Sequence, residues 1–213
     1  MIYDSLNAAV FARIPARATR ILDIGCGAGT LGGALKDRHP CEVVGVKYSN
    51  DEAESARQRL DRVEVADLNG FAPRQLGLFD CIVCSHVLEH LLQPERLLRE
   101  LAECLLPGGV IVVALPNVLF WKQRLQFLRG RFRYTDGGLM DRTHFRFFDW
   151  TTASALITDA GLVVSDGIAD GGLPLSSRLG AKASAAVDRS ALRRFPGLFG
   201  FQFVFVAGNA GSH

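Results

Sequence analysis

A glycine-rich turn early in the chain carries the clearest chemical signal. Gly25, Gly27 and Gly29 alternate directly after a short run of branched apolar residues. Glycine allows the backbone to turn sharply and to approach a ligand closely. The dinucleotide fingerprint G-x-G-x-x-G is broken, because Thr30 stands where its third glycine belongs. Asp23 adds a carboxylate inside the apolar run, which would repel a pyrophosphate and favours a cationic or zwitterionic ligand.

The segment 133–148 concentrates a second kind of chemistry in a stretch without regular periodicity. His144 could remove a proton from a substrate as a general base, and Asp141 could orient that histidine. Arg142 or Arg146 could hold an anionic group. The structural alternative is that Asp141 and Arg146 pair only to brace the loop.

His90 ends the string His86-Val87-Leu88-Glu89-His90, which fits the H-x-x-E-H pattern of one group of zinc peptidases. That pattern needs a helix and a further carboxylate ligand downstream. Here the string follows the apolar run 79–84, which predicts a buried strand, so no metal is expected. His90 then either lines the mouth of the active site or caps the following turn, and the sequence leaves both open.

Residues 118–133 interleave aromatic and basic side chains, and no acidic residue occurs between Asn117 and Thr135. The pattern predicts an amphipathic helix. This helix could form a lid over a pocket, pack its apolar face on the core or lie on an anionic membrane surface. Trp121 and Tyr134 are candidates for substrate contact. We expect a lid or substrate insertion at about 117–148.

Apolar runs and helical spacings alternate along the chain and predict the elements that position these residues. Strands are expected at 20–24, 42–46, 63–68, 79–84, 110–115, 162–165 and 199–207. Helices are expected at 5–14, 30–38, 51–59, 94–106, 149–160 and 174–194. This alternation predicts an α/β fold with a doubly wound, mostly parallel seven-stranded sheet, in a single domain over 1–213.

The bulk composition narrows the classes of protein. The chain has 213 residues and a formal net charge of +2, so nothing global indicates a nucleic-acid partner. No apolar run is long enough for a transmembrane helix, and the N-terminus lacks the basic region of a signal peptide. Five cysteines without a regular framework predict a reducing, cytoplasmic location. The oligomeric state stays open.

Several motifs in series resemble the class I S-adenosylmethionine-dependent methyltransferases. The stretch 20–30 resembles their motif I in the form D-x-G-x-G-x-G. Val-Leu-Glu-His at 87–90 and Leu-x-Pro-Gly-Gly at 105–109 are typical of the same family, and the resemblance runs from Ile21 to Asn117. The string Asp-Arg-Thr-His-x-Arg-Phe-Phe at 141–148 resembles bacterial methyltransferases often found with glycan and secondary-metabolite pathways. The resemblance also implies a Rossmann-like sheet whose last strand inserts antiparallel beside the fifth.

The resemblance implies S-adenosylmethionine as the cofactor, bound across the carboxyl ends of strands one to four. Asp67 would then take the adenine amino group, and the backbone N–H of Leu68 would meet the ring. The complete set of expected cofactor residues is Asp23, Gly25, Cys26, Gly27, Gly29, Lys47, Asp67, Leu68 and Ser85.

Lys47 is the main departure from the family pattern. The family places an acidic residue there, which accepts hydrogen bonds from both ribose hydroxyls, whereas lysine has donors and no acceptor. One explanation is weakened cofactor affinity, native or engineered. A second is that Ser49, Asn50 or Asp51 supplies the acceptor. A third is a ligand that carries a phosphate near the ribose.

Together these expectations favour a methyltransferase that acts on an oxygen or nitrogen atom of a small polar acceptor. A sugar, a nucleotide-sugar or a lipid-linked glycan is the expected acceptor class, the last with peripheral membrane contact. His144, His90 and Asp141 are the expected catalytic residues. The rival hypothesis is a catalytically impaired relative that acts as a binding or partner protein, which Lys47 motivates. A nucleotide-dependent enzyme of another chemistry on the same fold is the third.

Overall fold

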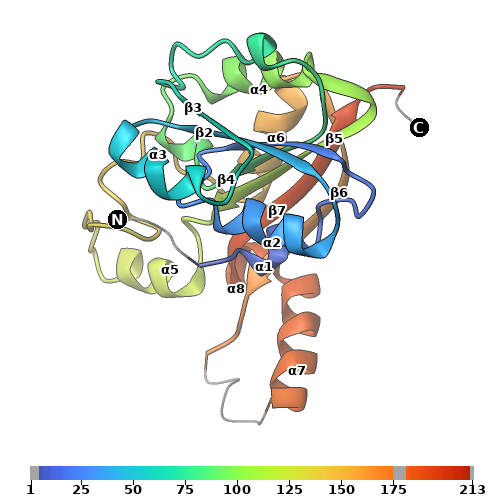
Figure 1. The fold of residues 1–213 in the computed structure, drawn as a ribbon. Coiled ribbons are helices and arrows are strands. Elements are labelled where there is room, and N and C mark those ends of the chain that lie inside the picture. Colours follow the sequence, from blue (N-terminus) through green and yellow to red (C-terminus); the bar gives the residue numbers. More distant parts are fainter. Residues whose placement is uncertain (1–4, 175–180, 212–213) are drawn as a thin grey trace.

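A seven-stranded sheet in the order β3-β2-β1-β4-β5-β7-β6 forms the centre of the computed structural model, which describes residues 5–174 and 181–211 (Figure 1). Its strands are β1 (Arg20–Ile24), β2 (Glu42–Lys47), β3 (Arg62–Val65), β4 (Phe79–Ser85), β5 (Leu105–Pro116), β6 (Leu162–Gly171) and β7 (Gly200–Asn209). The pairs among β1 to β5 are parallel, whereas β7 runs antiparallel between β5 and β6. The expected α/β class and the antiparallel last strand are confirmed.

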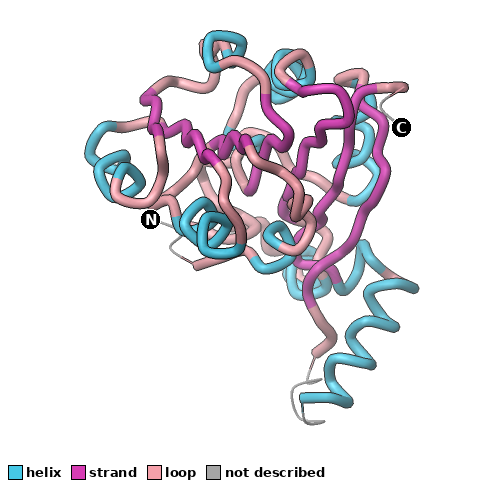
Figure 2. Tube along the Cα trace, turned by 45° about the vertical axis from the view of Figure 1, so that its right-hand side comes forward, coloured by secondary structure: helices cyan, strands magenta, loops and turns pink. Residues whose placement is uncertain are grey.

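Helices cover both faces of the sheet (Figures 1 and 2). They are α1 (Ala8–Phe11), α2 (Thr30–Arg38), α3 (Asn50–Arg57), α4 (Pro94–Ala102), α5 (Trp121–Leu128), α6 (Trp150–Asp159), α7 (Ala181–Arg194) and α8 (Pro196–Phe199), with 3₁₀ turns η1 (Pro73–Leu76) and η2 (Leu88–His90). α1, α2 and α3 share one core with the sheet, and α4 and α6 share the other. α7 projects away from the body of the protein in both views.

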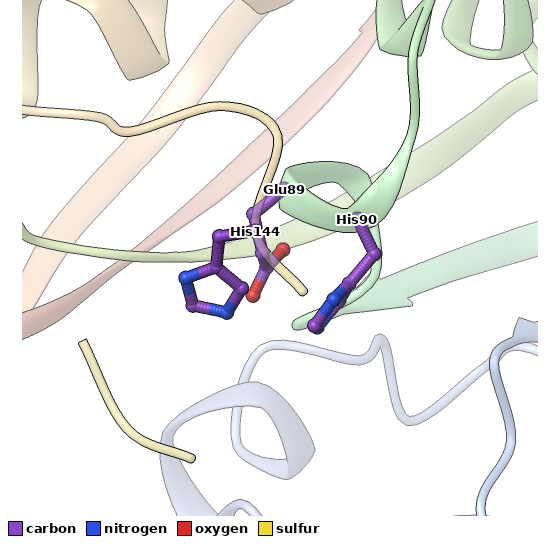
Figure 3. Close-up of side chains that lie close together, drawn as sticks. All are labelled: Glu89, His90 and His144. Atoms are coloured by element: carbon purple, nitrogen blue, oxygen red, sulfur yellow. The ribbon is translucent and has the colours of Figure 1, made fainter. Parts of the chain in front are cut away.

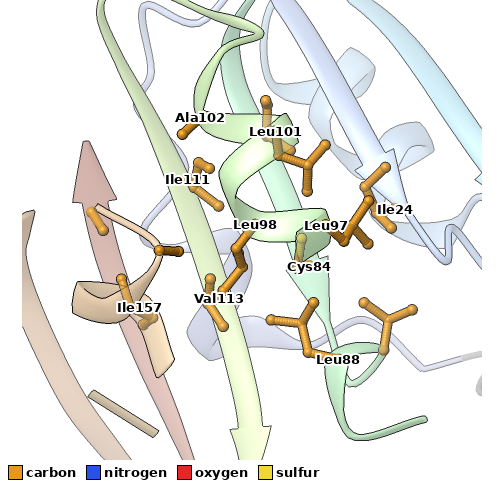
Figure 4. Close-up of a cluster of buried hydrophobic side chains, with 14 of the residues drawn as sticks. Ile24, Cys84, Leu88, Leu97, Leu98, Leu101, Ala102, Ile111, Val113 and Ile157 are labelled. Atoms are coloured by element: carbon orange, nitrogen blue, oxygen red, sulfur yellow. The ribbon is translucent and has the colours of Figure 1, made fainter. Parts of the chain in front are cut away.

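The two cores arise because successive strand residues point to opposite faces. Leu22 and Ile24 of β1 belong to the core under α4, whereas Ile21 belongs to the core under α2. Figure 4 shows Leu97 and Leu98 of α4 against the central strands, both fully buried. Each such side chain contributes roughly 1.5–3 kcal/mol by leaving water, so the central strands are held rigidly.

Several element boundaries differ from the expected ones, for local reasons. The helix expected over 118–133 is reduced to α5, because Gly130 adopts a φ of 70° and its N–H bonds back to Phe127 O at 2.8 Å. β6 extends beyond the expected 162–165, since it pairs with β7 as far as Gly171. β3 ends at Val65, so Asp67 and Leu68 follow the strand instead of ending it.

The stretch before strand five also differs from the expectation. α4 ends at Ala102, and Leu105 already pairs with Phe79 of β4. Gly108 has a φ of 76° and the register with β4 shifts here, so the expected tight turn is an irregularity inside β5. The helix expected over 5–14 is reduced to α1, and of the one expected over 174–194, residues 175–180 lie outside the described residues.

The carboxyl ends of β1 and β4 lie side by side at the point where the strand order reverses. In an open α/β sheet this reversal leaves a crevice in which ligands bind. The glycine turn follows β1, and the string 86–90 follows β4. Both chemical signals found in the sequence therefore fall at the same edge of the sheet.

Asp80 joins the beginning of β1 to β4. Its Oδ2 accepts hydrogen bonds from Thr19 N at 2.9 Å, Thr19 Oγ1 at 2.8 Å and Arg20 N at 2.8 Å. Burial by itself raises the pKa of this carboxyl, but the hydrogen bonds outweigh it and hold the pKa below the ordinary value.

Asp80→Ala is expected to lower the free energy of unfolding by about 1–3 kcal/mol, because it leaves these donors unpaired. Since the folded-state pKa is depressed, the contribution is present above the unfolded-state pKa of about 3.9 and is lost as pH falls through the folded-state pKa. Chemical denaturation at neutral and acidic pH measures the difference. Asp37→Ala, at an exposed position of α2, is the control. An equal loss at both pH values would contradict the assignment.

Candidate active site

The turn after β1 is built from glycines that no other residue replaces without strain. Gly25, Gly27 and Gly29 have φ angles of 72°, 56° and 77°. A Cβ atom at Gly25 would lie 3.0 Å from Cγ2 of Val87. Gly25 is exposed, so its backbone is open to a ligand. Left-handed φ values and close packing together explain the alternating glycines.

Backbone hydrogen bonds at Cys26 fix this turn to β2. Its backbone N–H and that of Gly25 both donate to Val46 O, at 3.2 and 2.9 Å. Its thiol is turned into the core, since a Cβ at Gly45 would lie 2.7 Å from Cys26 Sγ. Cys26 was predicted from the sequence as a cofactor residue. Because its thiol points into the core, only its backbone could contact a cofactor.

α2 begins directly behind the turn with its N-terminus uncapped by any side chain. The first N–H groups of a helix carry partial positive charge and attract anions. Asp23, near the end of β1, is almost fully buried. Burial raises the pKa of Asp23 to about 7, and the nearby Lys47 cation opposes that rise. The turn therefore offers both an anion-binding and a cation-binding element.

Lys47 ends β2, where it pairs in register with Val65 of β3. The structure brings it close enough to Asp23 to affect the titration of that carboxyl. Its position is the one at which the family resemblance predicted a ribose-binding acid.

Lys47→Glu is expected to tighten binding of S-adenosylhomocysteine roughly tenfold, because a carboxylate can accept from the ribose hydroxyls, and a hydrogen bond to a charged group contributes about 1.5–3 kcal/mol. Calorimetry at alkaline pH, where the introduced carboxylate and Asp23 would both be ionised, measures the change. Lys47→Met removes the cation without adding an acceptor and is the matched control. Weaker binding by Lys47→Glu would mean that Lys47 contacts the ligand, and would favour a phosphate-bearing cofactor.

The residues expected at the adenine follow β3 in a tight turn. Asp67 is exposed, and its Oδ1 accepts from Asn69 N at 2.9 Å and Asn69 Nδ2 at 3.1 Å. Leu68 is buried beside it. Ser85, at the end of β4, accepts a hydrogen bond of 3.4 Å from Asn7 Nδ2, the N-cap residue of α1. The contact of Asp67 and Leu68 with adenine, and that of Ser85 with the cofactor, stay predictions.

A compact group of three side chains lies at the end of β4 (Figure 3). Glu89 and His90 belong to η2, and His144 comes from the segment 117–148. The rings of His90 and His144 meet edge to face, with centroids 4.7 Å apart. Glu89 is 1% exposed, and each of the three offers a ligand atom within 4.8 Å of the others. We refer to Glu89, His90 and His144 as the acceptor cluster.

The segment 117–148 is anchored at its base and against η2. Val118 N donates to Phe148 O at 2.9 Å, which joins the two ends of the segment. Phe145 N and Arg146 N both donate to Glu89 O, at 2.9 and 3.2 Å. These backbone contacts bring His144 to the end of β4, although 54 positions separate it from His90 in the sequence.

Asp141 was expected to orient His144, but its side-chain hydrogen bonds lead to His90 instead, and it acts on the His144 ring only through its charge. Asp141 Oδ1 accepts from Thr143 N at 2.9 Å and from Thr143 Oγ1 at 2.7 Å. Thr143 O and Oγ1 lie 3.2 and 3.0 Å from His90 Nδ1. Because a carbonyl oxygen only accepts, Nδ1 carries the proton and Nε2 of a neutral His90 is left as an acceptor.

His86 is a site residue that sequence reasoning passed over. It has a φ of 54° and is the one non-glycine residue with positive φ among residues 5–174 and 181–211. Its Nδ1 lies 3.3 Å from Glu89 Oε1, and its Nε2 lies 2.8 Å from Gln202 Oε1. Burial lowers the pKa of His86, but these partners outweigh it and raise the pKa above the usual value. The H-x-x-E spacing of His86 and Glu89 was the sequence signal from which a role for His86 could have been predicted.

The two arginines proposed for substrate binding are engaged with carboxylates. Arg142 Nε lies 2.7 Å from Asp136, and Arg146 Nη1 lies 3.7 Å from Glu95. The alternative that Asp141 and Arg146 pair to brace the loop is wrong, because among the described residues Arg146 lies against Glu95 instead. Both arginine side chains are largely exposed, so an anion could still reach them.

A cavity of about 600 Å³ lies between α5, the segment after it and the end of β6. Lys122, Arg131 and Arg133 contribute its charged groups, and no lining residue is acidic. α5 buries none of its own residues, which disfavours plain packing on the core. Trp121 is half-buried, and within the described part of the chain its Nε1 has no hydrogen-bond partner, whereas Tyr134 is 54% exposed. The segment has the features of a lid, and that role stays a prediction.

Comparison with known proteins agrees with this geometry. A family model described as a methyltransferase domain matches residues 3–166. A trans-aconitate 2-methyltransferase of Azoarcus sp. (strain BH72) is 39% identical over 112 residues, covering 51% of this chain and 44% of its own. A ubiquinone biosynthesis O-methyltransferase of Xanthomonas campestris pv. campestris (strain B100) is 31% identical, covering 51% and 47%. The chain thus spans less than half the length of these curated relatives.

A solved structure supports the same fold over nearly the whole chain. The S-adenosylmethionine-dependent methyltransferase from Mesorhizobium loti has a TM-score of 0.64 at 19% identity and covers 93% of this chain and 95% of its own. Sheet order, glycine turn and helix positions define a class I α/β methyltransferase fold. The chain belongs to the S-adenosylmethionine-dependent methyltransferase family.

The residues present fit the cofactor of this family, S-adenosylmethionine. The glycine turn, with its left-handed φ angles, would let the backbone of the protein approach the cofactor closely. The start of α2 suits the carboxylate of the cofactor, and Asp23 suits its cationic centres.

None of the helices in the described part of the chain combines the length and the apolar character that a membrane crossing requires.

Proposed function

We propose that the protein is an active methyltransferase that transfers a methyl group to an oxygen or nitrogen atom of a small, anionic acceptor. The acceptor cluster is the observation that carries this proposal. It places His90 and His144 at the end of β4, next to the strand whose end forms the cofactor turn. Imidazoles at this position can act on an acceptor held beside the methyl donor.

Bound S-adenosylmethionine supplies an electrophilic methyl group. The protein then has to align the acceptor, exclude water and accept a proton from the hydroxyl or amine. Burial lowers the pKa of His144, and its neighbour His90 lowers it further, while the Glu89 and Asp141 carboxylates oppose the shift. His144 is therefore neutral at neutral pH and available to the acceptor. Asp141, through Thr143, keeps Nε2 of His90 available as well.

An anionic acceptor is supported by the charges around the cavity. Lys122, Arg131 and Arg133 line it without a counterbalancing carboxylate. Trans-aconitate, named for one relative, is an anion of this kind. The 141–148 string, typical of glycan-associated methyltransferases, extends the proposal to phosphorylated or nucleotide-linked sugars and to lipid-linked glycans that touch a membrane only peripherally.

Acceptor screening with radiolabelled S-adenosylmethionine tests the proposal. Arg131→Gln with Arg133→Gln should raise the Michaelis constant of the acceptor and reduce the inhibition by added salt, because exposed charges are screened. Arg189→Gln, at an exposed position of α7, is the control. If salt affects neither protein, the acceptor is uncharged and this part of the proposal is wrong.

The rival function is a catalytically impaired methyltransferase-like binding protein, and Lys47 at the ribose position favours it. Calorimetry with S-adenosylhomocysteine and turnover with active acceptors separate the two. Binding without turnover across the acceptor panel would support the rival.

A further inference from the structure

One carboxylate oxygen of the acceptor cluster has no hydrogen-bond partner despite its burial. Glu89 is 1% exposed, and its Oε2 is buried with no hydrogen-bond partner among residues 5–174 and 181–211. A buried carboxylate oxygen left unpaired is unfavourable unless a cation or a donor compensates it. His144 Nδ1 is also buried without a partner. Two unpartnered ligand-type atoms in one cluster point to a missing positively charged group.

We propose that Glu89, His90 and His144 bind a divalent first-row transition-metal ion. Two imidazoles and one carboxylate form the donor set that suits zinc, iron, cobalt and manganese, and three protein ligands leave positions open for a further molecule. Their ligand atoms lie within 4.8 Å of one another. A tetrahedral zinc site needs about 3.3 Å between ligand atoms, so modest side-chain rotations close the site.

The surrounding contacts orient the three ligands as metal sites require. His90 Nδ1 donates to Thr143, which leaves Nε2 as the metal-binding atom, and Asp141 holds Thr143 in place. His86 lies against Glu89 Oε1, which leaves Oε2 for the metal. Such partners fix the tautomer and direction of metal ligands and raise their affinity.

This site differs from the one that the string 86–90 suggested. The H-x-x-E-H pattern would use His86 and His90 on one helix, but η2 is a short 3₁₀ turn. The segment 117–148 instead supplies His144 as the second imidazole, and His86 supports Glu89 from behind. No metal was expected from the sequence because the string 86–90 does not lie on a helix. In the fold, His144 from the segment 117–148 joins Glu89 and His90 as the third candidate ligand.

The proposed ion would bind the acceptor, a role that rests on the proposed function. A divalent metal lowers the pKa of a bound hydroxyl and fixes its direction. Glu89 and His90 follow Val87, which lies against Gly25 of the glycine turn, and β4 pairs with β1, so an acceptor oxygen on the ion would lie near the methyl donor. The metal site itself needs no methyl transfer to be tested.

The test uses the full chain after treatment with EDTA and dialysis. Calorimetry with Zn²⁺ alone should show one equivalent bound, and Co²⁺ should give visible ligand-field absorption. Glu89→Gln, His90→Asn and His144→Asn should each weaken Zn²⁺ binding at least tenfold. His39→Asn, at the end of α2, should leave it unchanged. S-adenosylhomocysteine affinity, measured for every variant, establishes that each one is folded.

Each outcome decides the inference separately from the proposed function. Absence of Zn²⁺ and Co²⁺ binding, or equal binding by all the variants, overturns the metal site. Full turnover in EDTA overturns the role of the ion in holding the acceptor, while leaving the methyltransferase activity established. Zn²⁺ binding that depends on the three residues supports the site, even if no acceptor in the panel is methylated.

Discussion

Replacing His144 with alanine is expected to lower turnover by roughly 10²–10⁴-fold, the usual contribution of a proton-transfer group. His144 lies in the acceptor cluster and not in the glycine turn, so affinity for S-adenosylhomocysteine should change little. The loss is expected whether the imidazole takes the proton itself or holds a metal ion that acidifies the acceptor. Steady-state turnover and calorimetry on the same preparation measure both quantities.

His39→Ala is the matched control, because His39 bonds to the carbonyl of Ala18 on the far side of α2. Normal turnover by His144→Ala would transfer the catalytic role to His90 or remove it from both. An equal loss of cofactor binding and turnover would show that His144 mainly supports the fold of the 117–148 segment.

Replacing Asp23 with asparagine is expected to weaken S-adenosylmethionine binding by roughly 10–100-fold, because a charged contact contributes about 1.5–3 kcal/mol. The pKa of Asp23, raised by burial to about 7, gives this residue a pH signature. A cationic ligand attracts the ionised carboxylate. Affinity should therefore fall as pH drops below that pKa, by up to about tenfold per pH unit.

Calorimetry across the neutral range measures this dependence. The wild-type protein should release a proton on binding near neutral pH, whereas Asp23→Asn should bind weakly and without pH dependence. Affinity that is independent of pH in the wild type would show that Asp23 does not meet a cationic centre of the cofactor, and would leave it a structural residue under the turn.

Local patterns in the sequence determined the class of fold and the cofactor turn. Ile21, Leu22 and Ile24 predict a buried strand by their branched side chains, and β1 has the expected bounds. The glycines after it were predictable because positive φ angles are a local backbone demand that only glycine meets without strain. Errors arose where strand pairing or a single residue overrides local preference: Gly130 ends the helical stretch just after α5, and pairing with β7 extends β6.

Only the tertiary structure decided the acceptor side of the site. Glu89 and His144 meet because backbone hydrogen bonds fold a long segment back onto η2, and no local periodicity records such a contact. The same holds for the chain from Asp141 through Thr143 to His90, and for the burial that leaves Glu89 Oε2 without a partner. Burial and pairing depend on residues distant in sequence, so the chemistry of these groups follows from packing and not from spacing.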